Sequence, residues 1–173
     1  MAYTYSQIHI QTVFAVQNRM SLIKKEWRDD LYRYITGIIQ NHGHKMLAIG
    51  GVSDHIHIFF GFRPDEALSH LMMEVKRDSS LWIKQNHLVQ GRFSWQVGYG
   101  AFSYGKSQIS NVCRYIERQE EHHRKQTFRE EYIKFLEIYG VSYTPGRIFH
   151  DVSDIASTNT AFATDVAPLA GCG

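Results

Sequence analysis

The chain of 173 residues contains only two cysteines, Cys113 and Cys172, and they lie far apart. A disulfide-stapled domain and a cysteine-rich zinc ribbon are therefore excluded, and a reducing cytoplasm is the expected setting. No apolar run approaches the roughly 20 residues that cross a bilayer, so no membrane partner is expected. The first residues lack the basic and apolar regions of an export signal, and no GxGxxG phosphate loop occurs.

Charge of one sign is also scarce, because the net charge is only +2. Residues 1–140 carry +4 and residues 141–173 carry −2, so the folded part is mildly basic. A small basic excess permits binding to nucleic acid without requiring it. The hydrophobic fraction of 43% is ordinary for a globular domain with a real core.

The hydrophobic pattern predicts an α+β fold. Alternating or β-branched segments predict strands over 5–17, 45–50, 54–60 and 93–97, and helical spacing predicts helices over 24–41, 68–83, 107–124 and 127–139. This order is that of a ferredoxin-like βαββαβ antiparallel sheet with helices on one face and further helices at the C-terminal end. We expect one domain over residues 1–140 and a poorly ordered tail over residues 141–173.

Two histidines stand out in the predicted strand over 54–60. Because alternate side chains of a strand share a face, His55 and His57 stand side by side while Ile56 and Ile58 face away. Neighbouring imidazoles can bind a divalent metal when other ligands complete the shell. The alternative is a pair of core histidines bonded to carbonyl groups, and the spacing alone leaves both open.

Tyr115 and Gln119 lie four residues apart in the predicted third helix, so their side chains project from one side. A phenol is a weak nucleophile, but it can attack phosphorus when a metal withdraws charge from the phosphate. The Gln119 amide oxygen would complete a metal site with the two imidazoles. The alternative is a packed helix aromatic, since the chain has ten tyrosines. His122 and His123 follow in the sequence. They are expected either to lie on the surface or to approach phosphate or metal.

Several segments together resemble the single-tyrosine transposases of the insertion-sequence 200/605 type and their relatives associated with repeated extragenic palindromes. They occur in the family's order and spacing between about residues 5 and 140, and they read HIQTVFAVQNR, IGGVSDHIHIFF, LSHLMMEVKRDSSLWI, FSWQVGYGAFSYGKS and RYIERQEEHHRKQTFREEY.

The resemblance implies a catalytic domain over 1–140 in which His55 and His57 bind Mg²⁺ or Mn²⁺, Gln119 is the third ligand and Tyr115 is the nucleophile. It implies cleavage and rejoining of hairpin-bearing single-stranded DNA through a 5′-phosphotyrosine. The insertion-sequence members are dimers and the palindrome-associated relatives tend to be monomers. We expect a homodimer, with a monomer as the alternative, acting in the cytoplasm on nucleoid DNA.

Contacts to DNA are predicted from charge and aromaticity alone. Basic residues of the second helix region and aromatics of the glycine-rich segment 98–105 are the candidates: Lys76, Arg77, Lys84, Arg92, Tyr99, Phe102 and Tyr104. Two other functions share parts of this pattern. One is a ferredoxin-like module that holds nucleic acid without cutting it, and the other is a nicking enzyme retired from mobility and used on host palindromes.

Overall fold

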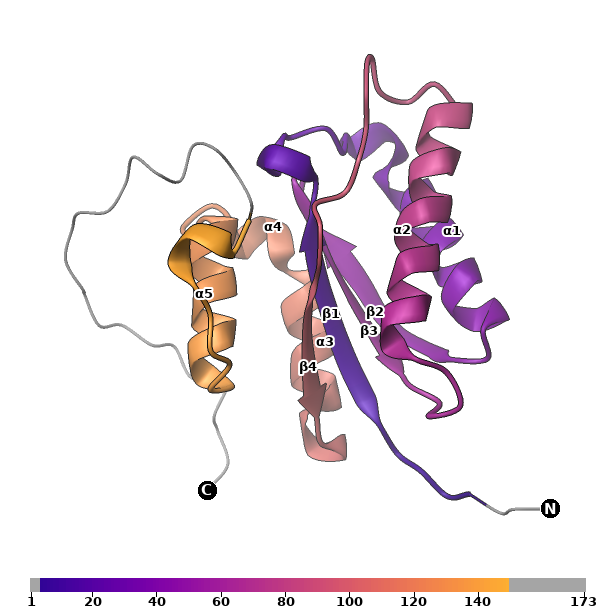
Figure 1. Cartoon of the computed structure of the whole chain (residues 1–173), viewed down its shortest axis with the longest axis vertical. Coiled ribbons are helices and arrows are strands. Elements are labelled where there is room, and N and C mark those ends of the chain that lie inside the picture. Colours follow the sequence, from indigo (N-terminus) through magenta and orange to yellow (C-terminus); the bar gives the residue numbers. More distant parts are fainter. Residues whose placement is uncertain (1–3, 150–173) are drawn as a thin grey trace.

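The computed structural model describes residues 4–149, and its centre is a four-stranded antiparallel sheet with the order β2-β3-β1-β4 (Figure 1). The strands are β1 (His9–Ala15), β2 (Lys45–Gly51), β3 (His55–Gly61) and β4 (Gly100–Tyr104). The helices are α1 (Lys25–Asn41), α2 (Leu68–Gln85), α3 (Ile109–Glu117), α4 (Gln119–His122) and α5 (Phe128–Ile138), and the 3-10 helices are η1 (Gln17–Arg19), η2 (Lys106–Gln108) and η3 (Pro145–Arg147). The predicted α+β class and ferredoxin-like order are confirmed.

Helices cover both faces of the sheet. Helices α1 and α2 pack on the face to which Ile56, Ile58 and Phe60 point, and α3 and α5 pack on the face that carries Val13 and Phe59 (Figure 1). Strand β3 lies second in the sheet and is covered on both sides, so its residues from His55 to Phe60 are all buried. Among residues 4–149, no helix is both long and apolar enough to cross a membrane.

The position of the fourth strand was predicted wrongly. Residues 93–97 contribute only an isolated bridge, between Trp95 and Val16, whereas β4 forms in the glycine-rich segment that was expected to bend as a loop. Trp95 instead turns its ring edge-on to Phe14, with 4.9 Å between ring centroids, and its indole donates to Ser79. In β4 burial alternates strictly along the strand, which is typical of a half-buried edge strand.

The third helix was predicted to run unbroken to about residue 124, and this too is wrong. It breaks at Arg118 (φ −100°, ψ 21°), which separates α3 from the single turn of α4. α3 also lies very close to β2, because a Cβ on Gly50 would sit 2.5 Å from the carbonyl oxygen of Ile116. Glycine at this position therefore sets how closely α3 approaches the sheet.

The C-terminal segment returns to the domain after α5. Of the predicted tail, residues 141–149 are described: they include η3 and end at Phe149, which is buried against Phe128 and Tyr132. Residues 150–173 lie outside the described residues.

Candidate metal and tyrosine site

His55 and His57 lie side by side on the sheet face beneath α3 and α5. They pair across the sheet with Ala15 and Val13 of β1, and both side chains are fully buried. Their ring centroids are 5.2 Å apart. Two imidazoles therefore point from the centre of the sheet into the interface with the C-terminal helices.

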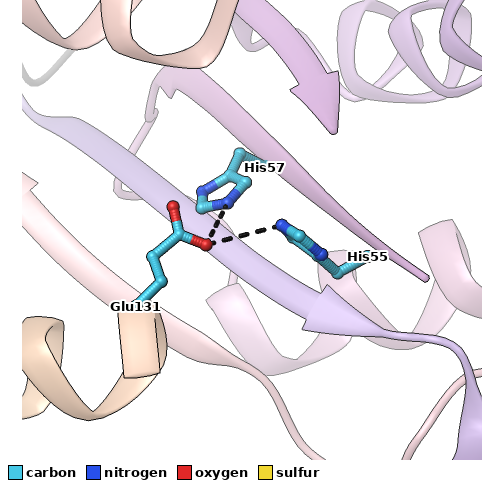
Figure 2. A group of neighbouring side chains, drawn as sticks. All are labelled: His55, His57 and Glu131. Atoms are coloured by element: carbon cyan, nitrogen blue, oxygen red, sulfur yellow. Dashed lines mark ion pairs between the residues drawn. The ribbon is translucent and has the colours of Figure 1, made fainter. Parts of the chain in front are cut away.

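Glu131 of α5 meets both histidines (Figure 2). Its Oε2 atom lies 3.4 Å from Nε2 of His55 and 3.4 Å from Nε2 of His57, and its side chain is only 4% exposed. A ligand atom from each of the three residues lies within 4.8 Å of the others. A buried carboxylate thus completes a group of three donors drawn from β3 and α5.

The break at Arg118 brings α4 toward this group. The Gln119 amide nitrogen donates to Oε1 of Glu131 at 3.3 Å, and its Oε1 lies 3.3 Å from Nε2 of His55. His123, one turn later, places Nε2 3.0 Å from Oε2 of Glu131. Gln119 therefore lies at the paired histidines, and His123 joins the same network.

Tyr115 of α3 contacts the same carboxylate. Its hydroxyl donates a hydrogen bond to Oε1 of Glu131, and its ring lies edge-on to His57 with 6.0 Å between centroids. Burial, reinforced by the Glu131 charge, raises the pKa of Tyr115, so the phenol is protonated in this arrangement. One chain thus brings together the four residues singled out in the sequence: His55, His57, Tyr115 and Gln119.

The charges of the site are arranged around the carboxylate. Burial opposes ionisation of Glu131, but the neighbouring His57 and hydrogen bonds from His123 and His55 outweigh it and lower the pKa of Glu131. Burial lowers the pKa of His57. For His55 burial acts in the same direction, but hydrogen bonds to Asp54 and Glu131 prevail and raise the pKa. The ionised Glu131 carboxylate therefore faces two imidazoles whose pKa values are shifted in opposite directions.

The donor set fits a divalent cation. Nε2 of His57 is buried without a hydrogen-bond partner, although the Glu131 carboxylate faces it at 3.4 Å. An orphaned buried nitrogen is costly unless something else engages it. Two imidazole nitrogens, a carboxylate oxygen and the Gln119 amide oxygen are a mixed N,O set that suits a first-row divalent ion.

Three of the predicted DNA contacts gather in one cleft. Arg77, Lys84 and Arg92 line a depression of about 660 Å³ between the second half of α2 and the segment after it. Arg77 also pairs with Asp78 at 2.6 Å and with Glu74 at 3.5 Å. The cleft is thus cationic, with one of its three charges partly neutralised by neighbours.

Lys76 has a different environment from those three residues. Its ammonium donates to the carbonyl oxygens of Gln96 and Gly98 and lies over the rings of Phe14 and Tyr99. Burial lowers its pKa to about 8. Lys76 therefore fastens the segment before β4 onto α2, and Tyr99 stands half-buried beside it.

Phe102 and Tyr104, which were predicted to stack on bases, are buried in this structure. Both side chains belong to β4 and point into the layer beneath α5, where they are 3% and 7% exposed. Phe102 stacks on Phe135, and the Tyr104 hydroxyl donates to Gln11. Their rings are therefore part of the core behind the histidines.

Glu131 was missed in the sequence, although a signal was present. The residue falls between Phe128 and Phe135 at helical spacing, on the side of α5 that packs on the sheet. A glutamate on the apolar side of an amphipathic helix is rarely buried unless it is paired. His123 was placed at a helix end, near metal or on the surface, and the structure puts it against Glu131.

Comparison with known proteins identifies the family and the fold. The sequence profile of the family described as "Transposase IS200 like" matches residues 4–119. A crystal structure of a candidate transposase from Deinococcus radiodurans R1 is 21% identical, with a TM-score of 0.52, covering 69% of this chain and 95% of its own. A tyrosine transposase bound to a REP hairpin is 14% identical, with a TM-score of 0.54, covering 71% of this chain and 74% of its own. At these identities the two structures show a common fold, and no curated protein matches the chain.

Proposed function

Because the chain belongs to the family of IS200-like transposases, we propose that it cuts and rejoins single-stranded DNA through a covalent bond to Tyr115. The observation that carries this proposal is the convergence of the Tyr115 hydroxyl and two imidazoles on one buried carboxylate. Nucleophile, proton acceptor and candidate metal ligands thus lie within one described domain.

The two oxygens of Glu131 have separate tasks in this scheme. Oε1 accepts the hydrogen bond from Tyr115 and so receives the phenol proton as the oxygen attacks phosphorus. The new bond joins the phenol oxygen to phosphorus, and the bond from phosphorus to the 3′ oxygen breaks. The products are a 5′-phosphotyrosine and a 3′-hydroxyl end, and rejoining is the reverse attack by a 3′-hydroxyl.

The second oxygen, Oε2, faces the histidines and belongs to the metal site. His55, His57, Glu131 and Gln119 would hold the ion, which we propose to be Mg²⁺ or Mn²⁺. When bound, such an ion stabilises negative charge on the phosphate and on the departing oxygen. The imidazole nitrogens favour Mn²⁺ over Mg²⁺, because Mg²⁺ prefers oxygen ligands.

We propose a DNA hairpin with flanking single strand as the substrate. A structural neighbour of similar fold is bound to a REP hairpin, which supports this class of substrate. The cationic cleft of Arg77, Lys84 and Arg92 suits a phosphate backbone, and half-buried Tyr99 remains the candidate for contact with a base. Lys76, held by backbone carbonyls, is better suited to shaping the segment near Tyr99 than to binding phosphate.

The same geometry bears on the number of subunits. Tyr115 lies at the histidines of its own chain, which supports a site completed within one chain and hence a monomer. The homodimer expected from the sequence stays a prediction. Sedimentation with and without a hairpin oligonucleotide distinguishes the two.

Two other functions are compatible with the fold. A host nicking enzyme for repeated palindromes would use the same residues and is separated from a mobile transposase by the surrounding genome. A binding module without chemistry would have no use for a tyrosine hydrogen-bonded to a buried glutamate beside two histidines. This arrangement therefore favours an enzyme.

The test is formation of a covalent adduct. Protein, Mn²⁺ and a labelled hairpin oligonucleotide should give a denaturant-resistant adduct, and Tyr115→Phe should abolish it because the nucleophilic oxygen is gone. Tyr34→Phe, which alters a tyrosine stacked on Trp82 at the α1–α2 surface, is the matched control and should keep it. His57→Ala should reduce the adduct strongly. An adduct that survives Tyr115→Phe would show that another residue is the nucleophile.

A further inference from the structure

A buried glutamine of β1 stands behind the metal site, on the side of His57 that faces away from Glu131. The Gln11 amide nitrogen lies 2.8 Å from Nδ1 of His57, and the Tyr104 hydroxyl donates to its Oε1 at 2.7 Å. Gln11 is 1% exposed and Tyr104 is 7% exposed, so water does not compete for these bonds. The three side chains form a line from β4 through β1 to β3.

This line determines which nitrogen of His57 carries the proton. An amide nitrogen only donates, so Nδ1 of His57 must accept from it, and the proton of the neutral ring sits on Nε2. A protonated Nε2 cannot bind a metal. The arrangement in which the amide nitrogen faces His57 is therefore a metal-free arrangement.

Turning the amide by 180° reverses the line without moving other atoms. Oε1 then faces His57 and accepts a hydrogen bond from its Nδ1–H, the amide nitrogen donates to the Tyr104 oxygen, and Nε2 of His57 has a free lone pair. Tyr104 can serve in both arrangements because a hydroxyl both donates and accepts. Burial is the main cause of a raised pKa for Tyr104, and a hydrogen bond with Tyr139 raises it further, so the phenol stays protonated.

The other histidine is prepared differently. Nδ1 of His55 lies 2.7 Å from Oδ1 of Asp54, and an ionised carboxylate can only accept. Nδ1 of His55 therefore carries its proton whether or not Nε2 binds a metal. His55 therefore has a partner that can only accept, the Asp54 carboxylate, whereas His57 has a partner that can donate or accept, the Gln11 amide.

We propose that Gln11 is a positioning residue that sets the tautomer of His57, and that its amide turns over when a divalent ion binds. The inference rests on the proposed metal site. Partners behind a metal-bound histidine commonly change metal affinity by about 10- to 100-fold. Gln11 would thereby make His57 a ligand only when its amide oxygen faces the ring.

The first test uses the unmodified protein and Mg²⁺, which is diamagnetic. In ¹⁵N-resolved NMR of the histidine rings, His57 should carry its proton on Nε2 without metal and on Nδ1 at saturating Mg²⁺. A ring already protonated on Nδ1 in the metal-free protein, or one whose tautomer is the same in both states, overturns the inference. Because no substitution is needed, this measurement stands whatever the variants do.

The second test measures Mn²⁺ affinity by calorimetry. Gln11→Met keeps the shape but removes the acceptor, and should weaken Mn²⁺ binding by about 10-fold or more. Gln11→Glu supplies a permanent acceptor and should bind Mn²⁺ at least as tightly as the wild type. Gln96→Met is the control, since Gln96 is a buried glutamine whose amide oxygen accepts from the Ala15 backbone. It should bind Mn²⁺ within about twofold of the wild type.

The outcomes separate this inference from the proposed function. If wild-type protein binds neither Mn²⁺ nor Mg²⁺, the proposed metal site itself fails. If Mn²⁺ binds and His57→Ala weakens it, but Gln11→Met binds Mn²⁺ like the wild type, only the role of Gln11 is refuted.

Discussion

Glu131→Gln is the substitution to which this protein should respond most sharply. The change preserves shape and removes one negative charge. In the metal-free protein the carboxylate accepts from Tyr115, Gln119 and His123, and it faces His55 and His57. An amide nitrogen in place of Oε2 would meet three imidazoles and leave at least one ring nitrogen without a partner.

The magnitude follows from the burial of this network. Removing one partner from a buried charge pair costs about 3–5 kcal/mol. For a domain of this size each kcal/mol lowers the melting temperature by about 2–4 °C, so the variant should melt about 6–20 °C below the wild type. The loss is this large because Glu131 is 4% exposed and water cannot replace it.

The same substitution should weaken the response to metal. An ion at 100 times its dissociation constant adds about 2.7 kcal/mol to stability, or about 5–11 °C for the wild type. Glu131→Gln should lose most of that increment, because it removes the anionic ligand.

Differential scanning fluorimetry with and without Mn²⁺ measures both effects. Glu137→Gln is the control, since Glu137 is an exposed residue of the same helix that accepts from the Tyr143 hydroxyl at 3.2 Å. The control should stay within about 0.5 kcal/mol of the wild type. A Glu131→Gln protein that melts like the wild type and gains the same increment from Mn²⁺ would refute the central role of this carboxylate.

Two further predictions concern the cleft and the packing of α3. Replacing the cleft residues Arg77, Lys84 and Arg92 together by glutamine should weaken hairpin binding. The negative slope of log affinity against log salt concentration should become shallower by up to about 2–3, as measured by fluorescence anisotropy. An unchanged slope would place the DNA elsewhere. Gly50→Ala should destabilise the protein by about 1–3 kcal/mol and reduce adduct yield, because its Cβ would meet the Ile116 carbonyl and push away the helix that carries Tyr115. Chemical denaturation and the adduct assay measure these effects. Wild-type values in both would show that α3 can shift to accept the Cβ without loss of stability or activity.

Much of the fold could be predicted from local patterns. Helical spacing predicted α1, α2 and α5 closely, because each of these helices buries one regular side. Short apolar runs predicted β2 and β3. The fourth strand was misplaced because a glycine-rich, aromatic segment is also typical of a loop. Only its pairing with β1 makes residues 100–104 a strand.

The sequence alone determined which residues are chemically capable of acting here: two imidazoles on one face of a strand, and a tyrosine and a glutamine four residues apart. Only the tertiary structure decided what joins them. Glu131 and Gln11 lie far from the histidines in the chain. Local periodicity does not predict contacts between residues that only the packing of distant segments brings together. The physical reason is that burial makes a charge or an amide matter, and burial depends on the whole fold.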